Sequence, residues 1–322
     1  MSHPHPHPVR YVILGAGAVG GVVGGLLAVA GHEVALLARG DHLAAIRRDG
    51  LQVQTPGTVH QLKLDAAADP AELGLRDGDV VLLAVKGNDT EAALQSVART
   101  GVRGLTVVCL QNGVANERLA LRYFADVYGI CVMLPATHLE PGVVRADCAP
   151  VPGILDIGRI PSGLDDQAAR ISADLRSAGF VSELREHIMP WKYCKLLVNL
   201  GNGIRAVCVP AERVEELVAE ARAEAAAVLD AAGIAYVSEA EDRRRRGDIL
   251  QLKGSRSGSS SWQSLERGTG SIETDYLNGE IVQLARQLGR PAPLNERIQR
   301  WATRFAAEHR PPGTLTVEEW LS

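Results

Sequence analysis

Aromatic residues are scarce in this chain of 322 residues, at 4%, and positive charge is not in excess. Charged residues make up 22% of the chain and the formal net charge is −4, which argues against nucleic acid as a partner because binding phosphates needs a basic face. Locally placed cations can still bind an anionic small molecule. With 46% hydrophobic residues and 33 glycines, the composition favours a packed α/β protein and gives no sign of disorder.

The cysteines are few, and no two of them form a C-x-x-C pair. They are odd in number and lie at Cys109, Cys131, Cys148, Cys194 and Cys208. We therefore expect neither a disulfide framework nor a metal site such as zinc, and a reducing, cytoplasmic location is the natural interpretation. Cys194 adjoins Lys195, but successive residues of a helix face different directions, so we interpret Cys194 as structural.

Only one uncharged run is long enough to suggest a membrane segment or a signal peptide. Residues 11–31 carry no charge, and residues 28–30 resemble a signal-peptidase site. However, the run is rich in glycine, and Arg10 is the only Lys or Arg upstream of it. The strand-like segment that follows directly, residues 33–38, fits a βαβ unit better. We therefore expect no membrane association.

Strand and helix patterns alternate along the first half of the chain. The opening residues 1–8 alternate His and Pro, and we expect a disordered tail there, with metal binding by the histidines as a weaker alternative. Strands are predicted at 11–14, 33–38, 80–85, 105–110 and 127–133, and helices at 18–30, 90–99 and 116–124. This alternation predicts a Rossmann-type, doubly wound parallel sheet. An antiparallel extension is expected within 135–161, then a helix at 165–178 and a last strand at 180–184.

The alternation stops near residue 187, and helical patterns follow. They cover residues 190–202, 212–232, 238–252, 273–289 and 294–309, with glycines at the breaks. We therefore predict two domains, a nucleotide-binding domain at 9–186 and an all-helical domain at 187–322 that binds substrate and could form a homodimer. The run Arg243–Arg246 is interpreted as a solvated face or a subunit contact, with a polyanion site as a distant alternative.

A glycine motif lies between the first strand and the first helix. In a G-x-G-x-x-G sequence the first glycine permits a tight turn, the second lets the backbone approach a pyrophosphate, and the third allows close contact between helix and strand. The helix start adds free N–H groups and the positive end of the helix dipole. Because a strand, a helix and a second strand occur in register, we predict a dinucleotide site formed by Gly15, Ala16, Gly17, Ala18, Val19 and Gly20.

The residue that ends the second strand indicates which dinucleotide binds. NAD sites usually carry Asp or Glu there, whereas the 2′-phosphate of NADP favours Arg. This chain has Arg39, with no acidic residue until Asp41. A guanidinium offers planar, charge-assisted donors to phosphate, so we predict NADPH. Lys86, at the end of the strand at 80–85, is either a second positive charge for the cofactor or an ordinary exposed lysine.

Polar residues interrupt an apolar helical segment at 191–202. Lys195, Asn199 and Asn202 follow the spacing i, i+4 and i+7, which places them on one helix face. Such a stripe is costly if buried without polar partners, so it either faces water or lines a polar site, and its apolar surroundings favour the site. A partly desolvated lysine can serve as the general acid in ketone reduction, and asparagines can orient a substrate. The segment 111–113, Gln-Asn-Gly, follows a strand end on the cofactor side.

Two later motifs complete a pattern that extends over nearly the whole chain. They are S-S-x-x-Q within residues 259–265 and E-x-D-Y-x-N-G within residues 271–279. Together with K-L-x-V-N at 195–199 and the glycine motif, they make the chain resemble the ketopantoate reductase (2-dehydropantoate 2-reductase) family. These later motifs are far more specific than G-x-G-x-x-G.

The resemblance implies NADPH-dependent reduction of ketopantoate to pantoate, a step of pantothenate biosynthesis. It implies that Lys195 is the general acid and that Glu273 is coupled to it. It also implies substrate contacts from Asn112, Asn199 and Ser261, and cofactor contacts from the glycine motif, Arg39, Lys86, Asn112 and Glu273. Family members often carry a further Asn four residues after the position of Asn199. That position is Gly203 here, and we expect Asn202 to take over its role.

Two alternatives remain open at this point. One is a paralogous NADPH-dependent reductase of another keto acid or of an imine. The other is a non-catalytic regulator that senses NADPH. The pairing of Lys195 with Glu273 argues against the regulator, because a sensor needs no proton donor.

Overall fold

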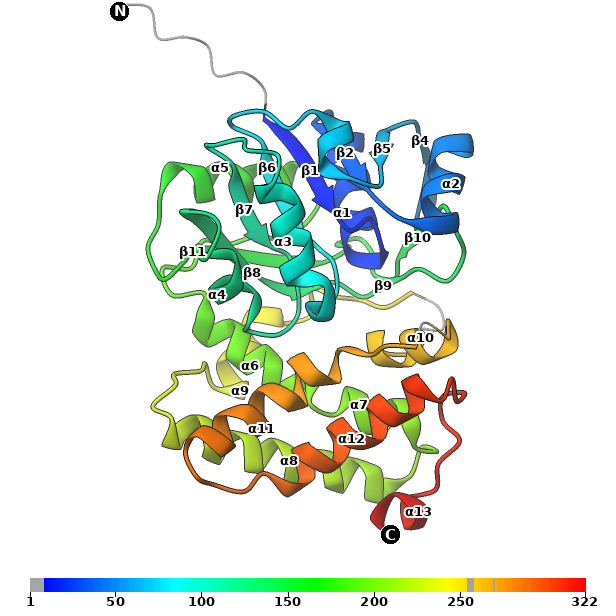
Figure 1. The fold of residues 1–322 in the computed structure, drawn as a ribbon, viewed down its shortest axis with the longest axis vertical. Coiled ribbons are helices and arrows are strands. Elements are labelled where there is room, and N and C mark those ends of the chain that lie inside the picture. Colours follow the sequence, from blue (N-terminus) through cyan, green and yellow to red (C-terminus); the bar gives the residue numbers. More distant parts are fainter. Residues whose placement is uncertain (1–8, 254–257, 269) are drawn as a thin grey trace, which may run out of the picture.

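The computed structural model describes residues 9–253, 258–268 and 270–322, and it consists of a sheet region followed by a helical region (Figure 1). The His-Pro segment at 1–8, for which we expect a disordered tail, lies outside the described residues. The chain begins with a βαβ unit formed by β1 (Arg10–Leu14), α1 (Ala18–Val29) and β2 (Glu33–Leu37). These bounds agree with the predicted strand, helix and strand to within one residue at each end.

The main sheet has seven strands in the order β11-β8-β7-β6-β1-β2-β5. Its remaining strands are β5 (Asp65–Ala67), β6 (Val80–Leu83), β7 (Thr106–Cys109), β8 (Asp126–Met133) and β11 (Ile154–Arg159). All pairs are parallel except β8 with β11. The predicted Rossmann-type sheet is therefore confirmed. The strand order reverses beside β1, and ligands of such sheets bind at the carboxyl ends of the strands near that point.

Both faces of the sheet are covered. The side chains of Tyr11 and Ile13 pack in one core with α1 and α5 (Asp166–Ser177), whereas those of Val12 and Leu14 pack in a second core with α3 (Thr90–Ala98). This alternation follows from the period of two along a strand. Shorter helices connect the strands, namely α2 (Gly40–Asp49), η1 (Pro70–Leu73), η2 (Gly87–Asp89) and α4 (Asn116–Ala120).

A second sheet was not predicted. It has four strands in the order β4-β3-β10-β9, with bounds β3 (Leu51–Thr55), β4 (Thr58–Leu62), β9 (Ala136–Thr137) and β10 (Val143–Ala146). The expected antiparallel extension at 135–161 is therefore only part of the arrangement, because β10 also pairs in parallel with β3. The strand expected at 180–184 is wrong. That segment makes backbone hydrogen bonds with β11 but forms only isolated bridges, because Ser182 Oγ bonds to Leu155 O and the Glu183 N–H bonds to the side chain of Asp156.

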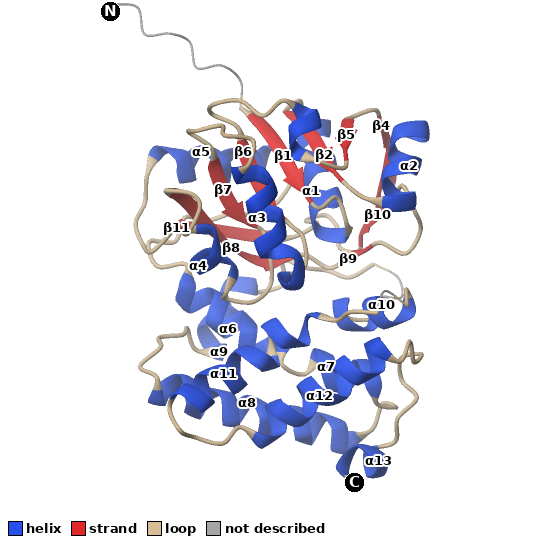
Figure 2. Cartoon of the chain, in the orientation of Figure 1, coloured by secondary structure: helices blue, strands red, loops and turns tan. Residues whose placement is uncertain are grey.

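The helical region follows β11 and α5, and Figure 2 shows only helices and loops there. Its elements are α6 (Met189–Asn199), α7 (Asn202–Val207), α8 (Glu212–Ala231), α9 (Glu239–Arg246), α10 (Ser260–Glu266), η3 (Glu273–Tyr276), α11 (Asn278–Gln287), α12 (Pro293–Ala307) and α13 (Val317–Leu321). Three expected helices need correction: 190–202 is two helices, 238–252 ends at residue 246, and 273–289 begins as a 3-10 turn. Within the described ranges, no helix is both long and apolar enough to cross a bilayer.

The cysteines and possible metal ligands add no reactive centre to this fold. All five cysteines are buried. Burial raises the pKa of the Cys194 thiol to about 11, which agrees with a structural role for that residue. No group of three or more His, Cys, Asp or Glu that could hold a metal ion occurs in the part of the chain that the structure describes.

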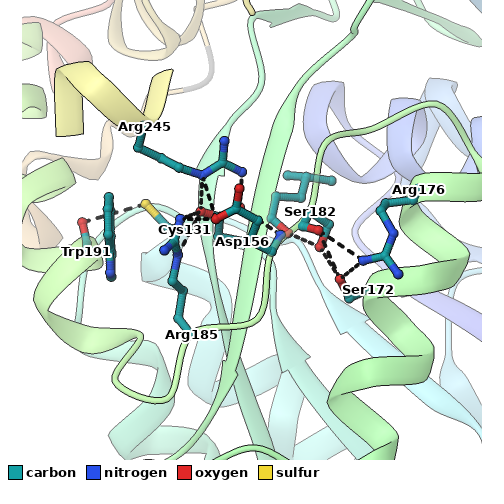
Figure 3. A network of polar contacts seen from close by, with 10 residues as sticks. Cys131, Asp156, Ser172, Arg176, Ser182, Arg185, Trp191 and Arg245 are labelled. Atoms are coloured by element: carbon teal, nitrogen blue, oxygen red, sulfur yellow. Dashed lines mark hydrogen bonds and ion pairs between the residues drawn. The ribbon is translucent and has the colours of Figure 1, made fainter. Parts of the chain in front are cut away.

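The arginine run on α9 is not the uniformly solvated face that we expected. Arg245 Nε and Nη2 donate to the two carboxylate oxygens of Asp156 on β11, at 2.8 and 2.6 Å (Figure 3). Arg185 donates to the same carboxylate and stacks on Trp191, with its guanidinium carbon 4.2 Å from the ring centroid. Asp156 is only 2% exposed. Arg245 of this run and Arg185 therefore form an ionic clamp with Asp156, and the clamp ties α9 to the sheet.

Breaking this clamp is expected to be costly, because two partly buried guanidinium groups would lose their shared carboxylate. We expect Asp156→Ala to lower the free energy of unfolding by about 3–5 kcal/mol. Arg244→Ala, on the exposed side of the same helix, should change it by less than about 0.5 kcal/mol. Urea unfolding followed by tryptophan fluorescence measures both. Equal stability of the two variants would contradict the clamp.

Candidate functional site

The glycine-rich loop at the end of β1 has the shape of a phosphate cradle. Gly15 has a φ of +107°, and a Cβ on it would lie 2.8 Å from the backbone nitrogen of Val85. A Cβ on Gly20 would collide with the Gly15 carbonyl, whereas one on Gly17 would meet nothing within 4 Å. Thus the first and third glycines are needed for packing, and the second borders open space. Because α1 also starts without a side-chain cap, its N–H groups are available and the loop fits a dinucleotide pyrophosphate.

A histidine that the sequence analysis missed holds this loop. His42 Nε2 lies 2.7 Å from the carbonyl oxygen of Ala16, and the Gly142 N–H donates to His42 Nδ1 at 2.8 Å. Since Nδ1 accepts, the ring is neutral and donates from Nε2. Burial lowers the pKa of His42, and it lowers that of the neighbouring His138 to about 4. A neutral ring therefore fixes the loop at physiological pH.

The two predicted cationic ligands of the cofactor differ in their surroundings. Arg39 follows β2, is exposed, and makes no ion pair with any residue that the structure describes. Lys86 follows β6, is half-buried, and its Nζ donates to Ser264 Oγ on α10 at 2.9 Å. Burial lowers the pKa of Lys86, although the nearby carboxylate of Glu273 opposes the change. The alternative that Lys86 is an ordinary exposed lysine is therefore wrong.

Glu273 lies on η3, where the helical region meets the edge of the sheet. Its Oε1 accepts a hydrogen bond from the Gly87 N–H at 3.1 Å. Burial raises the pKa of Glu273, and the bond to Gly87 and the charge of Lys86 counteract this rise. The adjacent Tyr276 leaves no room for a Cβ on Gly87, because its Cγ would lie 2.8 Å away. This contact packs η3 against η2 beside Lys86.

Lys195 lies on α6 and is half-buried beside a small cavity at the carboxyl edge of the sheet. The cavity is lined by Gln111, Asn112, Gly113, Ile130, Cys131, Val132, Lys192 and Lys195. Asn199 Nδ2 donates to Asn112 Oδ1 at 3.1 Å. The structure therefore brings Lys195, Asn199 and Asn112 together, although they come from the two regions of the chain.

Asn202 does not continue the same helix face. The helix α6 ends at Asn199, and Asn202 is the first residue of α7. The break is at Gly201, where a Cβ would lie 2.7 Å from the side chain of Val218 on α8. The prediction of one continuous helix through 190–202 is therefore wrong at residues 200–201, where a glycine lets α8 pack closely.

The loop that carries Asn112 is held by buried amides. Gln111 Nε2 donates to the Val85 carbonyl at 2.6 Å and to Thr90 Oγ1 at 2.8 Å. Asn116 Nδ2 donates to the Asn112 carbonyl at 3.0 Å and its Oδ1 accepts from Thr90. Thr90 and Asn116 were missed because a threonine and an asparagine at helix starts read as ordinary capping residues.

The three serines at the start of α10 differ in their contacts and exposure. Ser259 caps the helix by accepting from the Trp262 N–H at 3.3 Å. Ser261, the predicted substrate ligand, is 3% exposed, whereas Ser260 is exposed. Gln263 Nε2 donates to the Ala136 carbonyl of β9 at 3.2 Å, which anchors α10 on the sheet region. Ser260 is therefore the exposed hydroxyl of this run.

Two family models match the chain. The model described as "Ketopantoate reductase PanE/ApbA" matches residues 11–162, and "Ketopantoate reductase PanE/ApbA C terminal" matches residues 187–304. The 2-dehydropantoate 2-reductase of Pyrococcus horikoshii is 32% identical over 297 residues, which cover 89% of this chain and 94% of the relative.

Solved structures have the same overall fold. A PanE/ApbA family ketopantoate reductase from Ralstonia eutropha superposes with a TM-score of 0.79 at 30% identity, covering 94% of this chain and 99% of the other. A D-mandelate dehydrogenase solved with NADH and anilino(oxo)acetate also gives a TM-score of 0.79, with the same coverage, at 22% identity. At that identity the second likeness concerns the fold alone.

Proposed function

Because this chain belongs to the ketopantoate reductase family, we propose that it reduces a 2-keto acid with NADPH, and that its substrate is ketopantoate, which becomes pantoate. The observation that carries the proposal is the meeting of Lys195 with the Asn112–Asn199 pair at a cavity on the carboxyl edge of the sheet. A lysine and two amides thus lie at the sheet edge that carries the glycine cradle, and this supports their assignment as proton donor and substrate ligands.

A bound nicotinamide would supply the hydride, and the residues of the chain bind, orient and protonate the substrate. Lys195 Nζ donates a proton to the carbonyl oxygen of the keto acid, which takes up negative charge as it is reduced. The amides of Asn112 and Asn199 orient the substrate, because an amide can both donate and accept. Asn202 and Ser261 would complete the substrate contacts.

On the cofactor side, Gly15 to Gly20 would hold the pyrophosphate, and Arg39 and Lys86 would supply positive charge to the phosphates. Glu273 accepts from the Gly87 N–H and lies near Lys86, and this supports a role in shaping the cofactor side of the site. The coupling of Glu273 to Lys195 is part of the same proposal.

The remaining expectations belong to this proposal. They are a nucleotide-binding domain at 9–186, a substrate domain at 187–322, a homodimer through the helical domain, and a cytoplasmic location. Sedimentation of the purified protein tests the dimer, and separate expression of the two segments tests the boundary.

Two other functions remain testable with one panel of compounds. A paralogous reductase would oxidise NADPH faster with another keto acid or an imine than with ketopantoate. A regulator would bind NADPH without oxidising it in the presence of any of them. Measuring kcat/KM across the panel, together with the Kd of NADPH, separates the three functions.

The cofactor preference depends on Arg39. We expect NADPH to be preferred over NADH by at least about tenfold in kcat/KM, since one charge-assisted contact of ~1.5–3 kcal/mol suffices. Arg39→Ala should raise the KM for NADPH and leave kinetics with NADH nearly unchanged. Arg48→Ala, which removes an exposed arginine on α2, the helix that follows Arg39, is the control and should keep the preference. Equal use of both cofactors by the unmutated protein would overturn the assignment of NADPH.

A further inference from the structure

A buried ion pair lies directly beside the proposed site and has no role in the function proposed so far. Lys192 Nζ lies 2.8 Å from Glu117 Oε1, and their side chains are 2% and 1% exposed. Lys192 is on α6, and Glu117 is on α4 of the sheet region. Burying both charges removes their hydration, so the pair is weak evidence for stability by itself and needs another explanation.

The other contacts of Lys192 explain why this buried pair is present. Its Nζ also donates to the backbone carbonyls of Gln111 and Ile130, at 2.9 and 3.1 Å. An ammonium has three N–H donors, and the carboxylate and the two carbonyls supply three acceptors. Lys192 Nζ is hydrogen-bonded to the two carbonyls and ion-paired with Glu117, so a proton exchange with a substrate would disturb the contacts that it makes with the backbone. Its role must be to hold backbone in position.

Lys192 and Asn199, which both contact the loop 111–113, lie on either side of Lys195 along one face of α6. Lys192, Lys195 and Asn199 are spaced i, i+3 and i+7, so they point the same way from α6. Lys192 holds the carbonyl of Gln111, and Asn199 holds the side chain of the next residue, Asn112. The helix is thus attached to the loop 111–113 at two points, with Lys195 between them.

We propose that Lys192 and Glu117 are positioning residues, which fix the loop 111–113 against α6 and thereby set the distance between Lys195 and Asn112. Glu117 supplies the countercharge that keeps the Lys192 ammonium in a buried site. This inference rests on the proposed function, because Lys195 and Asn112 are the groups that it positions. A misplacement of reacting groups by about 1 Å can cost on the order of 10²-fold in rate.

The test compares Lys192→Met with the double variant Lys192→Met/Glu117→Gln. The single variant leaves Glu117 buried without its cation and is expected to be less stable. The double variant has no buried charge and should recover thermal stability, but it still lacks a donor for the two carbonyls. We expect kcat with ketopantoate to fall by on the order of 10- to 10²-fold in both, and the Kd of NADPH to change by a much smaller factor, because Asn112 is only one of the expected cofactor contacts. Lys63→Met makes the same chemical change at an exposed lysine and should alter neither kcat nor the Kd of NADPH.

A second measurement needs no turnover. Amide hydrogen exchange of the peptide that spans residues 110–117 should be faster in both Lys192 variants than in the unmutated protein or in Lys63→Met. A double variant that recovers stability, normal kcat and slow exchange would overturn the positioning role. If the unmutated protein does not reduce ketopantoate at all, the proposed function fails, and the exchange result still decides whether Lys192 holds the loop.

Discussion

Lys195→Ala is expected to lower kcat by on the order of 10²–10⁴, which is the range for loss of a general acid. Lys195 is half-buried at the cavity that Asn112 also lines. The other lysine among the described lining residues, Lys192, is held by Glu117 and two backbone carbonyls. The binding of NADPH should survive, because the glycine cradle and Arg39 lie on other elements.

The pH dependence distinguishes a proton donor from a simple positive charge. A general acid must be protonated to act, so activity falls as pH rises through its pKa, and this basic limb of the kcat–pH profile should vanish in Lys195→Ala. Lys195→Arg keeps a cation but cannot release a proton near neutrality, so its kcat should stay low. Near-normal kcat in Lys195→Ala would show that the lysine is structural or merely attracts anions.

The second large effect concerns the hydroxyl at the far end of ketopantoate. We expect the analogue without it, 2-keto-3,3-dimethylbutyrate, to be reduced at least roughly 10²-fold less efficiently, because a site built around a hydroxyl leaves its own polar groups unpaired when that hydroxyl is absent. Asn199, with Asn202 nearby in sequence, is the group that we expect to read the hydroxyl. Asn199→Ala should therefore erase most of the preference.

The readout is the ratio of kcat/KM for the two substrates, measured with the unmutated protein and with Asn199→Ala. A ratio cancels any general loss of activity that follows from losing the bond between Asn199 and Asn112. If the unmutated protein reduces both substrates equally well, the pantothenate-pathway assignment fails. The paralogous reductase then becomes the better interpretation.

Local patterns predicted the parts of the fold that local chemistry dictates. The apolar strands beside β1 and the glycine motif give a βαβ unit because their spacing alone fixes the turn and the packing, and those bounds agree with the structure. The second sheet was missed because β10 pairs with β3 across a long separation in sequence. The alternation of apolar and polar residues at 51–54 indicates a strand, but no local pattern identifies a pairing partner so far away in the sequence.

The site shows the same division. Lys195 and Asn199 were singled out because polar residues interrupt an apolar helix, and Asn112 because it follows a strand end and matches the family pattern. Lys192 carried no such signal, since an unpaired lysine in a sequence reads as a surface residue, and only the fold brings Glu117 and two carbonyls to it. Likewise, Arg245 in a run of four arginines cannot be told from its exposed neighbours until β11 supplies Asp156.

The central claim is that this chain reduces ketopantoate with NADPH, and one measurement tests it most directly. Purified protein is incubated with NADPH and ketopantoate, and the NADPH consumed is compared with the pantoate formed, identified by mass spectrometry. We expect one pantoate for each NADPH oxidised, and almost none with Lys195→Ala. NADPH that binds but is not oxidised, or that is oxidised without forming pantoate, would contradict the account.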